Sequence, residues 1–181
     1  MKLVAIIGSR NPIGQTAKAV GAFVSGVEKM GGECEQIFLP PMKIERCRQC
    51  DENGWGICRT EGKCVIDDDF ASIISKIKEA NAVVFATPVY FSDLSESIRA
   101  FLDRLRRTCM HEVGKQNTAG KKAIGICVAG GGGGGSLSCS VSLERVVSTC
   151  GFDLFDVIPV RRQNLEMKLA VLEATGKWMA K

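Results

Sequence analysis

The sequence predicts an α/β fold built on an open, doubly wound, five-stranded parallel sheet, with its strands in the order 2-1-3-4-5. Two observations predict this fold class. Five short, mainly apolar runs alternate along the 181 residues with segments whose apolar residues recur at helical spacing. The connections between successive runs are long enough to contain a helix, as the crossover between two parallel strands requires.

The N-terminal part of the chain supplies a strand, a helix and a second strand. Leu3–Ile7 is a continuous apolar run, which is typical of a strand buried on both faces. The next segment predicts a helix that ends at Gly31–Gly32. Its apolar residues at helical spacing are Ala17, Val20, Val24 and Val27. Cys34–Leu39 predicts the second strand, and Pro40–Pro41 ends it because proline cannot donate a ladder hydrogen bond.

In the middle of the chain, a third strand lies between two predicted helices. The acidic triplet Asp67–Asp69 precedes the first helix and suits the positive end of a helix dipole. That helix carries Phe70, Ile73, Ile74 and Ile77. Ala82–Ala86 is the apolar run of the third strand. The second helix carries Leu94, Ile98, Phe101, Leu102 and Leu105.

The C-terminal part adds two strands, each followed by a helix. Ala123–Val128 predicts the fourth strand, and Phe152–Val160 predicts the fifth, which we expect Pro159 to shorten. The helix between them carries Leu143, Val146, Val147 and Cys150. A final helix runs from Leu165 towards Trp178. Strand and helix thus alternate in a flavodoxin-like order, and ligands of such sheets bind beyond the carboxyl ends of the strands.

Composition bounds the class of protein. A chain of 181 residues is long enough for one core and too short for two, so we expect one domain over residues 1–181. Lys and Arg are spread along the chain despite the net charge of +4, and aromatic residues make up only 6%, so we expect no nucleic-acid partner. The N-terminal apolar run is too short for a signal peptide, and no segment approaches the roughly 18 apolar residues of a membrane span. We therefore expect a cytoplasmic protein without a membrane partner.

Four loops that follow predicted strands carry residues suited to ligand binding. They span residues 9–16, 47–64, 87–93 and 129–136. Because the carboxyl ends of parallel strands meet at one edge of a sheet, we expect all four loops to share a site.

The first loop has the chemistry of a phosphate site. It combines hydroxyl, amide and guanidinium groups with the start of a helix, whose free N–H groups favour an anion. The candidate residues are Ser9, Arg10, Asn11, Gly14, Gln15 and Thr16. Neither a Gly-Lys-Ser/Thr sequence nor the three-glycine dinucleotide pattern is present, so a monophosphate fits best. A plain helix-capping turn is the alternative.

The loops after the third and fourth strands could flank a flat ring. The former supplies apolar, aromatic and backbone surface from Pro88, Val89, Tyr90, Phe91 and Ser92. The latter lets main-chain groups approach a ligand without intervening side chains at Ala129, Gly130, Gly131 and Gly132. The alternative for the two aromatic residues is that they anchor their loop on the core. The alternative for the glycine run is that it is a flexible connector.

Four of the nine cysteines are clustered: Cys47, Cys50, Cys58 and Cys64. Thiolates this close repel one another unless a metal, an iron-sulfur cluster or disulfide formation offsets their charge. A reducing cytoplasm disfavours disulfides. Three possibilities remain: a [4Fe-4S] cluster, a zinc ion, and no metal, although structural zinc sites more often have two close Cys-x2-Cys pairs.

The other reactive side chains have simpler interpretations. Cys34, Cys127 and Cys150 occupy apolar positions and are predicted to be small core residues. No role is predicted for Cys139. Cys109 lies two residues from His111, the only histidine, but without a third orienting residue we favour a coincidence over a nucleophile. Asp103 and Arg104 are predicted to form a structural ion pair or a subunit contact.

Several of these segments resemble the NADPH-dependent FMN reductase superfamily and, within it, the iron-sulfur flavoproteins. They are Gly8–Thr16, Gly62–Asp69, Ala86–Phe91 and Phe101–Arg104, and the resemblance runs from Lys2 to about Cys150. It implies a flavodoxin-like fold, FMN phosphate on the first loop, and the isoalloxazine ring against Pro88–Ser92 and the glycine loop. It also implies assembly into homodimers or homotetramers.

The cysteine spacing departs from the pattern of that family. The family's motif has two residues between the second and third cysteines, whereas this chain reads Cys-x2-Cys-x7-Cys-x5-Cys. Gly54 and Gly56 could let the extra residues loop out while Cys58 reaches a cubane cluster, and Trp55 could cover it.

The sequence therefore predicts an FMN-dependent oxidoreductase that relays electrons between FMN and a [4Fe-4S] cluster. Its donor would be NAD(P)H or a reduced carrier protein, its acceptor a small molecule or a protein, and no side chain is needed as an acid or base. Arg161 and Arg162 could meet a dinucleotide phosphate or an acidic partner. One alternative is an NAD(P)H-dependent FMN or quinone reductase whose cysteine loop holds zinc or nothing. Another is a non-enzymatic redox sensor or electron carrier.

Overall fold

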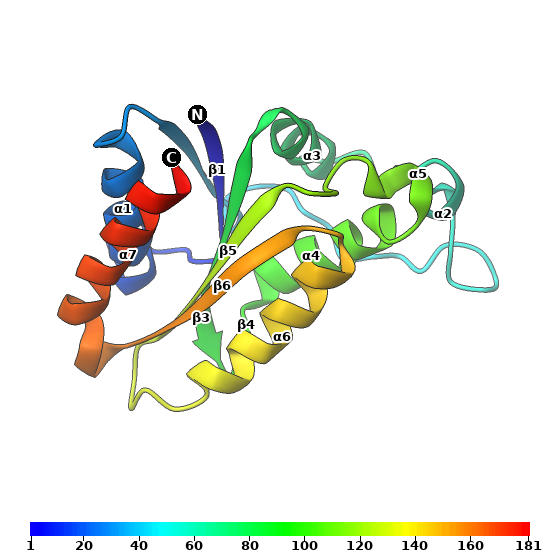
Figure 1. Ribbon diagram of the computed structural model, residues 1–181. Coiled ribbons are helices and arrows are strands. Elements are labelled where there is room, and N and C mark those ends of the chain that lie inside the picture. Colours follow the sequence, from blue (N-terminus) through cyan, green and yellow to red (C-terminus); the bar gives the residue numbers. More distant parts are fainter.

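The computed structural model describes residues 1–181, and five parallel strands form its central sheet in the order β2-β1-β3-β5-β6 (Figure 1). The strands are β1 (Lys2–Ile7), β2 (Glu33–Phe38), β3 (Ala82–Tyr90), β5 (Lys122–Ala129) and β6 (Asp153–Arg161). Counted among themselves, these five strands have the order 2-1-3-4-5. The predicted fold class is confirmed.

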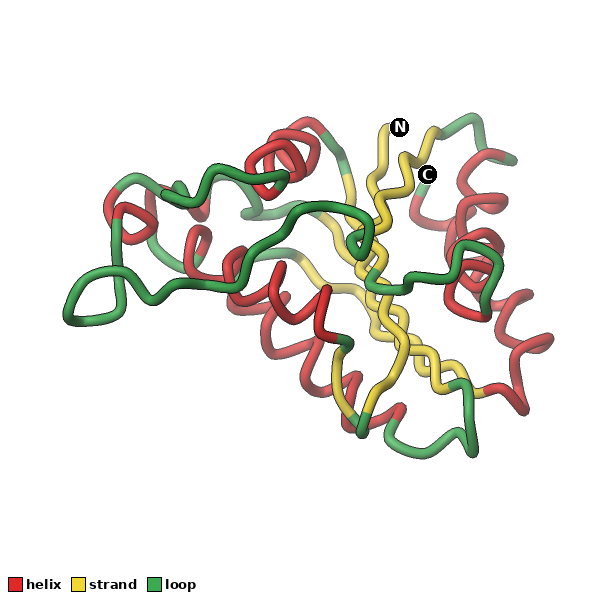
Figure 2. Tube along the Cα trace, turned by 180° about the vertical axis from the view of Figure 1, so that it is seen from behind, coloured by secondary structure: helices red, strands yellow, loops and turns green.

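Helices cover both faces of the sheet (Figures 1 and 2). On one face lie α1 (Gln15–Glu28) and α7 (Leu165–Met179), and on the other lie α3 (Phe70–Glu79), α4 (Glu96–Cys109) and α6 (Ser136–Thr149). Strand β1 shows why both layers form. Its side chains alternate, with Val4 and Ile6 in the core under α3, α4 and α6, and Leu3, Ala5 and Ile7 in the core under α1 and α7.

Helices α1 and α7 touch through their backbones. A Cβ atom built on Gly26 would lie 2.1 Å from the carbonyl oxygen of Glu173, so only glycine fits at this crossing. Lys29 and Lys177 both form ion pairs with the carboxylate of Glu173 beside it. The last helix is thereby held against the first.

Strand β3 is longer than predicted and ends in a hairpin. It continues through Pro88 to Tyr90, turns at Phe91 and Ser92, and pairs antiparallel with β4 (Asp93–Leu94). Both turn residues have positive φ, as a two-residue hairpin turn requires, although neither is a glycine or an asparagine. The prediction that Leu94 belongs to the following helix is therefore wrong.

Pro159 does not shorten the last strand, contrary to the prediction. Strand β6 continues through Pro159 to Arg161 and pairs with β5 from Asp153 to Arg161, with one irregularity at Phe155. Because β6 is an edge strand, a proline whose nitrogen faces away from β5 removes no ladder hydrogen bond.

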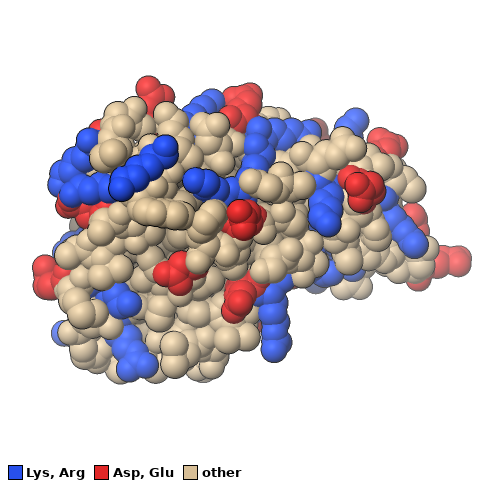
Figure 3. All heavy atoms as spheres, viewed as in Figure 1, with Lys and Arg blue, Asp and Glu red and all other residues tan.

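Short helices lie in segments that were predicted as loops. They are α2 (Ile57–Thr60), α5 (Glu112–Lys115) and the 3-10 turn Arg162–Asn164. None of the helices combines the length and hydropathy needed to cross a membrane. Basic and acidic side chains are interspersed over the face shown in Figure 3.

Candidate functional site

Three of the four predicted loops meet in one hollow beyond the carboxyl ends of β1, β3 and β5. The hollow has a volume of about 420 Å³, within the range of small-molecule sites. It is lined by Ser9, Asn11, Gly14, Gln15, Thr16, Pro88, Val89, Tyr90, Val128, Gly130 and Gly131. Of the other residues predicted to bind the cofactor, Arg10, Phe91, Ser92, Ala129 and Gly132 do not line it.

The first loop folds on its own polar groups and leaves the start of α1 open. Oδ1 of Asn11 accepts the N–H of Ile13 at 3.0 Å, and Oγ of Ser9 accepts the N–H of Asn11 at 3.3 Å. No side chain caps α1, so its first N–H groups remain available to an anion. The observed geometry suits a phosphate.

Gln15 carries an unused acceptor in this hollow. Its Oε1 atom is buried and has no hydrogen-bond partner. A Cβ atom on Gly130 would lie 3.9 Å from it, so the amide faces the glycine loop across the hollow. A buried acceptor without a donor is costly, and a flavin ring has an N–H group that could satisfy it.

The hairpin tip and the glycine loop support each other. A Cβ atom on Gly135, whose φ is +75°, would lie only 2.5 Å from Cα of Ser92. Tyr90 and Phe91 are exposed by 50% and 105% and do not pack on the core. The alternative that these two aromatic residues anchor the loop on the core is therefore wrong.

The four clustered cysteines line a different cavity. Cys47, Cys50, Cys58 and Cys64 border a small cavity of about 20 Å³ together with residues from the second half of α4, and it shares no lining residue with the hollow. The prediction that this loop shares one edge of the sheet with the other three loops is therefore wrong within one chain. Helix α4 begins at the carboxyl edge, where Oγ of Ser95 donates to the carbonyl of Gly8, and runs back towards the amino ends of the strands (Figure 1). The cysteine segment lies on its far half.

The middle of the cysteine segment is anchored on α4. Nη1 of Arg107 donates to the carbonyl of Gly54 at 2.6 Å, and its guanidinium lies 4.7 Å from the centre of the Trp55 ring. The Trp55 and His111 rings meet edge to face at 4.8 Å. Our sequence reasoning missed the roles of Arg107 and His111, since their partners lie more than 50 residues away along the chain.

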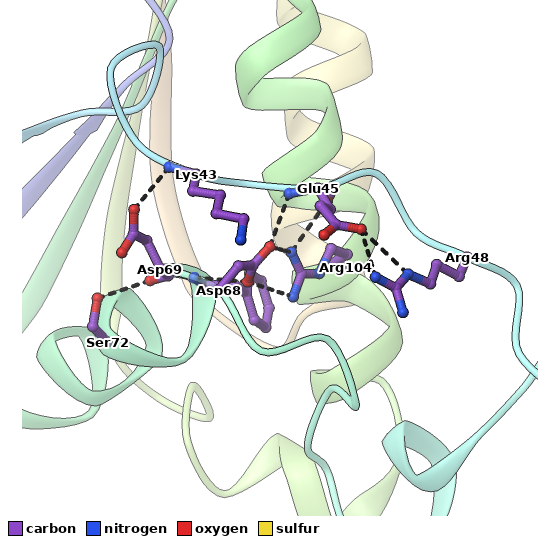
Figure 4. A network of polar contacts seen from close by, with 8 residues as sticks. Lys43, Glu45, Arg48, Asp68, Asp69, Ser72 and Arg104 are labelled. Carbon is purple, nitrogen blue, oxygen red and sulfur yellow. Dashed lines mark hydrogen bonds and ion pairs between the residues drawn. The ribbon is translucent and has the colours of Figure 1, made fainter.

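A buried ion pair holds the two ends of the segment on α4 (Figure 4). Nη1 and Nη2 of Arg104 donate to the carboxylate of Asp68 at 2.6 and 2.9 Å, and Nη1 also reaches the carbonyl of Glu45 at 3.1 Å. The two side chains are 1% and 0% exposed. The predicted pairing of Asp103 with Arg104 is therefore wrong, because Asp68 is the partner.

Asp68 also accepts the N–H groups of Glu45 and Phe70, at 2.8 and 3.1 Å. Burial acts to raise the pKa of Asp68, but the hydrogen bonds from Arg104 and these two N–H groups outweigh it and leave this pKa lowered. Asp68 thus stays ionised and accepts the N–H of Phe70, the first residue of α3, whereas Asp69 at the N-cap makes no side-chain capping bond, so the predicted N-cap is not formed.

The cysteine cavity has the donors of a metal site without the geometry of one. All nine cysteines are free thiols, and no three Cys, His, Asp or Glu side chains are close enough to hold a metal ion. Four thiols beside three arginines, Arg48, Arg104 and Arg107, nevertheless suit an anionic metal-thiolate group. The donor set fits a cluster, and the loop would have to tighten around it.

The other cysteines are mostly core residues. Cys127 and Cys150 are fully buried, as predicted, and so is Cys139, while Cys34 is only half-buried. Burial raises the pKa of Cys109, which argues against a nucleophile at that position.

Comparison with known proteins identifies the family. Residues 1–169 match the family described as NADPH-dependent FMN reductase. The chain belongs to this family. The match confirms the resemblance to this family that the sequence indicated.

Named relatives include iron-sulfur flavoproteins. One from Methanocaldococcus jannaschii is 32% identical over 131 residues, covering 72% of this chain and 65% of the relative. Another, from Methanosarcina thermophila, is 30% identical over 134 residues, covering 72% of this chain and 63% of the relative. The chain spans between about half and two thirds of the length of the curated relatives it matches most strongly.

Solved structures support the fold. An NAD(P)H:quinone oxidoreductase from Methanothermobacter marburgensis superposes with a TM-score of 0.72 at 18% identity, covering 100% of this chain and 96% of that one. An archaeal flavodoxin gives a TM-score of 0.64 at 13% identity, covering 99% and 96%. At these identities the similarity shows a flavodoxin-like fold.

Proposed function

We propose that residues 1–181 form a single FMN-binding domain that acts as a flavin-dependent oxidoreductase. The observation that carries this proposal is the hollow where three strand-end loops meet, with an uncapped helix start at one side and glycine backbone at the other. An electron donor of the NAD(P)H type is supported by the family's description. The set of reduced thiols suits the cytoplasm.

The residues of the hollow divide into two groups by chemistry. Ser9, Asn11, Thr16 and the free N–H groups of the first turn of α1, which follows Gly14, would hold the phosphate, and the side-chain amide of Gln15 would face the ring. Pro88, Val89, Tyr90, Gly130 and Gly131 would flank the ring, exclude water from one side and orient it. The remaining predicted residues, Arg10, Phe91, Ser92, Ala129 and Gly132, would border the site. When bound, FMN supplies the exchange of hydride and single electrons.

We further propose that Cys47, Cys50, Cys58 and Cys64 hold a [4Fe-4S] cluster that exchanges electrons with FMN and with a small-molecule or protein acceptor. Their position around one cavity supports this assignment, and so do the names of the relatives. We propose assembly into homodimers or homotetramers, as the family resemblance implies.

A flavin spectrum and an elemental analysis test these proposals. Protein purified without oxygen should show flavin absorption or bind added FMN, and it should contain iron and acid-labile sulfide. A protein with neither flavin absorption nor affinity for FMN would contradict the main proposal.

A second candidate is an NAD(P)H-dependent FMN or quinone reductase with zinc or no metal in the cysteine cavity. Its metal-free form is favoured by the spread of the cysteines, since no three Cys, His, Asp or Glu side chains are close enough to hold a metal ion. Under this candidate, turnover of NADPH with a quinone proceeds in protein that contains no iron. Rapid turnover with small acceptors alone would also count against a non-enzymatic redox sensor or carrier.

A further inference from the structure

The guanidinium of Arg104 uses only part of its hydrogen-bonding capacity within the protein. Nη1 and Nη2 are taken up by Asp68 and by the carbonyl of Glu45 (Figure 4). Nε is buried and has no partner, although the side chain is only 1% exposed. A buried N–H donor destabilises the fold unless another group accepts a hydrogen bond from it.

The cysteine cavity is where an acceptor could lie. Arg104 lines this cavity together with all four clustered cysteines. Sulfur atoms bound to a metal keep negative charge and accept hydrogen bonds from nearby N–H groups.

The position of Arg104 is fixed from three sides. Asp68 binds it with two hydrogen bonds, Glu45 accepts a third, and the guanidinium lies 4.2 Å from the centre of the Phe70 ring. Because Asp68 already balances its charge, Arg104 offers the cavity a fixed donor and not an unpaired cation.

We propose that Arg104 donates its Nε–H to a sulfur of the metal-thiolate group held by Cys47, Cys50, Cys58 and Cys64. Asp68, Glu45 and Phe70 orient the guanidinium for this bond. The hydrogen bond stabilises the more negative, reduced form of the group, so it raises the reduction potential and slows metal loss. This inference rests on the proposed cluster.

The test compares three substitutions in the anaerobically purified, full-length protein. Arg104→Lys keeps the positive charge beside Asp68 and removes the Nε donor. Asp68→Asn keeps the Nε donor and removes a negative charge. Arg106→Lys makes the same chemical change on the same helix at a residue that does not line the cavity.

The measurements are iron and sulfide content, the midpoint potential from a redox titration followed by electron paramagnetic resonance, and the rate of iron loss to a chelator. For Arg104→Lys we expect a more negative potential and weaker retention of iron, by about 10- to 100-fold, the usual effect of losing an outer partner of a metal ligand. For Asp68→Asn the potential should stay or rise, and Arg106→Lys should match the wild type.

A second measurement needs no change at position 104. Pulsed electron paramagnetic resonance on the reduced wild-type protein, labelled with 15N at arginine Nε, should detect a nitrogen coupled to the cluster. The coupling should persist in Arg48→Lys and in Arg107→Lys, because these are the other two arginines that line the cavity. Arg104 acts only as a structural anchor if this coupling is absent. The same conclusion follows if Arg104→Lys and Asp68→Asn shift the potential in the same direction, or if Arg104→Lys has the wild-type potential. Wild-type protein that contains no iron would contradict both the proposed cluster and the proposed hydrogen bond. It would not contradict FMN binding, which the flavin spectrum tests separately.

Discussion

Replacing Gly135 with alanine tests whether the hairpin tip and the glycine loop form one rigid wall of the hollow. The φ of +75° at Gly135 is a left-handed conformation that costs other residues about 1–2 kcal/mol. A Cβ atom there would lie 2.5 Å from Cα of Ser92, and ordinary carbon contacts are about 1 Å longer. The neighbouring atom belongs to the backbone, so no rotation of a side chain can relieve the overlap.

The overlap adds about 1–3 kcal/mol, the usual cost of overpacking. Together with the backbone strain, the total is about 2–5 kcal/mol. If the wall stays closed, the free energy of unfolding of the apoprotein falls by this amount. If Ser92 and the loop move apart, the hollow changes shape and the cost appears as weaker FMN binding, where each 1.4 kcal/mol is about tenfold in Kd.

Urea denaturation of the apoprotein and a fluorescence titration with FMN measure the two parts. Gly134→Ala is the matched control, because a Cβ at this adjacent residue meets nothing within 4 Å and the backbone has no positive φ. It should change neither quantity appreciably. If Gly135→Ala equals Gly134→Ala in both measurements, the two loops do not form a common wall.

Three further predictions concern the core, the buried ion pair and the cysteines. Gly26→Ala should lower the free energy of unfolding by about 1–3 kcal/mol, because its Cβ atom would overlap the backbone of α7. Gly21→Ala, in open space on the same helix, should raise this free energy by about 0.5–1 kcal/mol. Urea midpoints of the two variants that shift in the same direction would contradict this prediction. Asp68→Asn should cost about 3–5 kcal/mol near neutral pH, because it leaves Arg104 buried without its counter-charge. Since the folded-state pKa of Asp68 lies below the ordinary value of 3.8, its contribution is present above that pH and is lost as pH falls through the folded pKa, so the difference between wild type and variant should shrink in acid unfolding curves. Cys64→Ser should lose iron and keep the wild-type Kd for FMN, because the cavity and the hollow share no residue; a parallel loss of FMN, measured by absorption, would show that the two sites depend on each other.

The strands and the three loops of the hollow could be predicted because their signals are local. Leu3–Ile7 is apolar on both faces, and such a run has few alternatives to a buried parallel strand. The extension of β3 could not be predicted in this way, since it depends on left-handed conformations at Phe91 and Ser92 that these residue types seldom adopt.

The cysteine segment was misplaced because contacts between distant residues decide its position. Asp68 and Arg104 lie 36 residues apart, and no periodicity connects them. One signal was available: Arg104 lies three residues after Phe101, on the apolar side of an amphipathic helix. A charged residue in that position requires a buried partner, and the acidic triplet beside the last cysteine supplied one.

Helix α4 is the element that connects the two candidate sites. Oγ of Ser97, in its first turn, donates to the carbonyl of Gly8, where the first loop begins, and Arg104 and Arg107 line the cysteine cavity two turns later. The rise of 1.5 Å per residue places Ser97 and Arg104 about 10 Å apart along the axis. A rigid helix of this kind fixes the distance between the hollow and the cavity while keeping their residues separate. Under the proposed function, electron exchange through the cluster and FMN binding should therefore respond to different substitutions, the first at Arg104 and the second in the three loops.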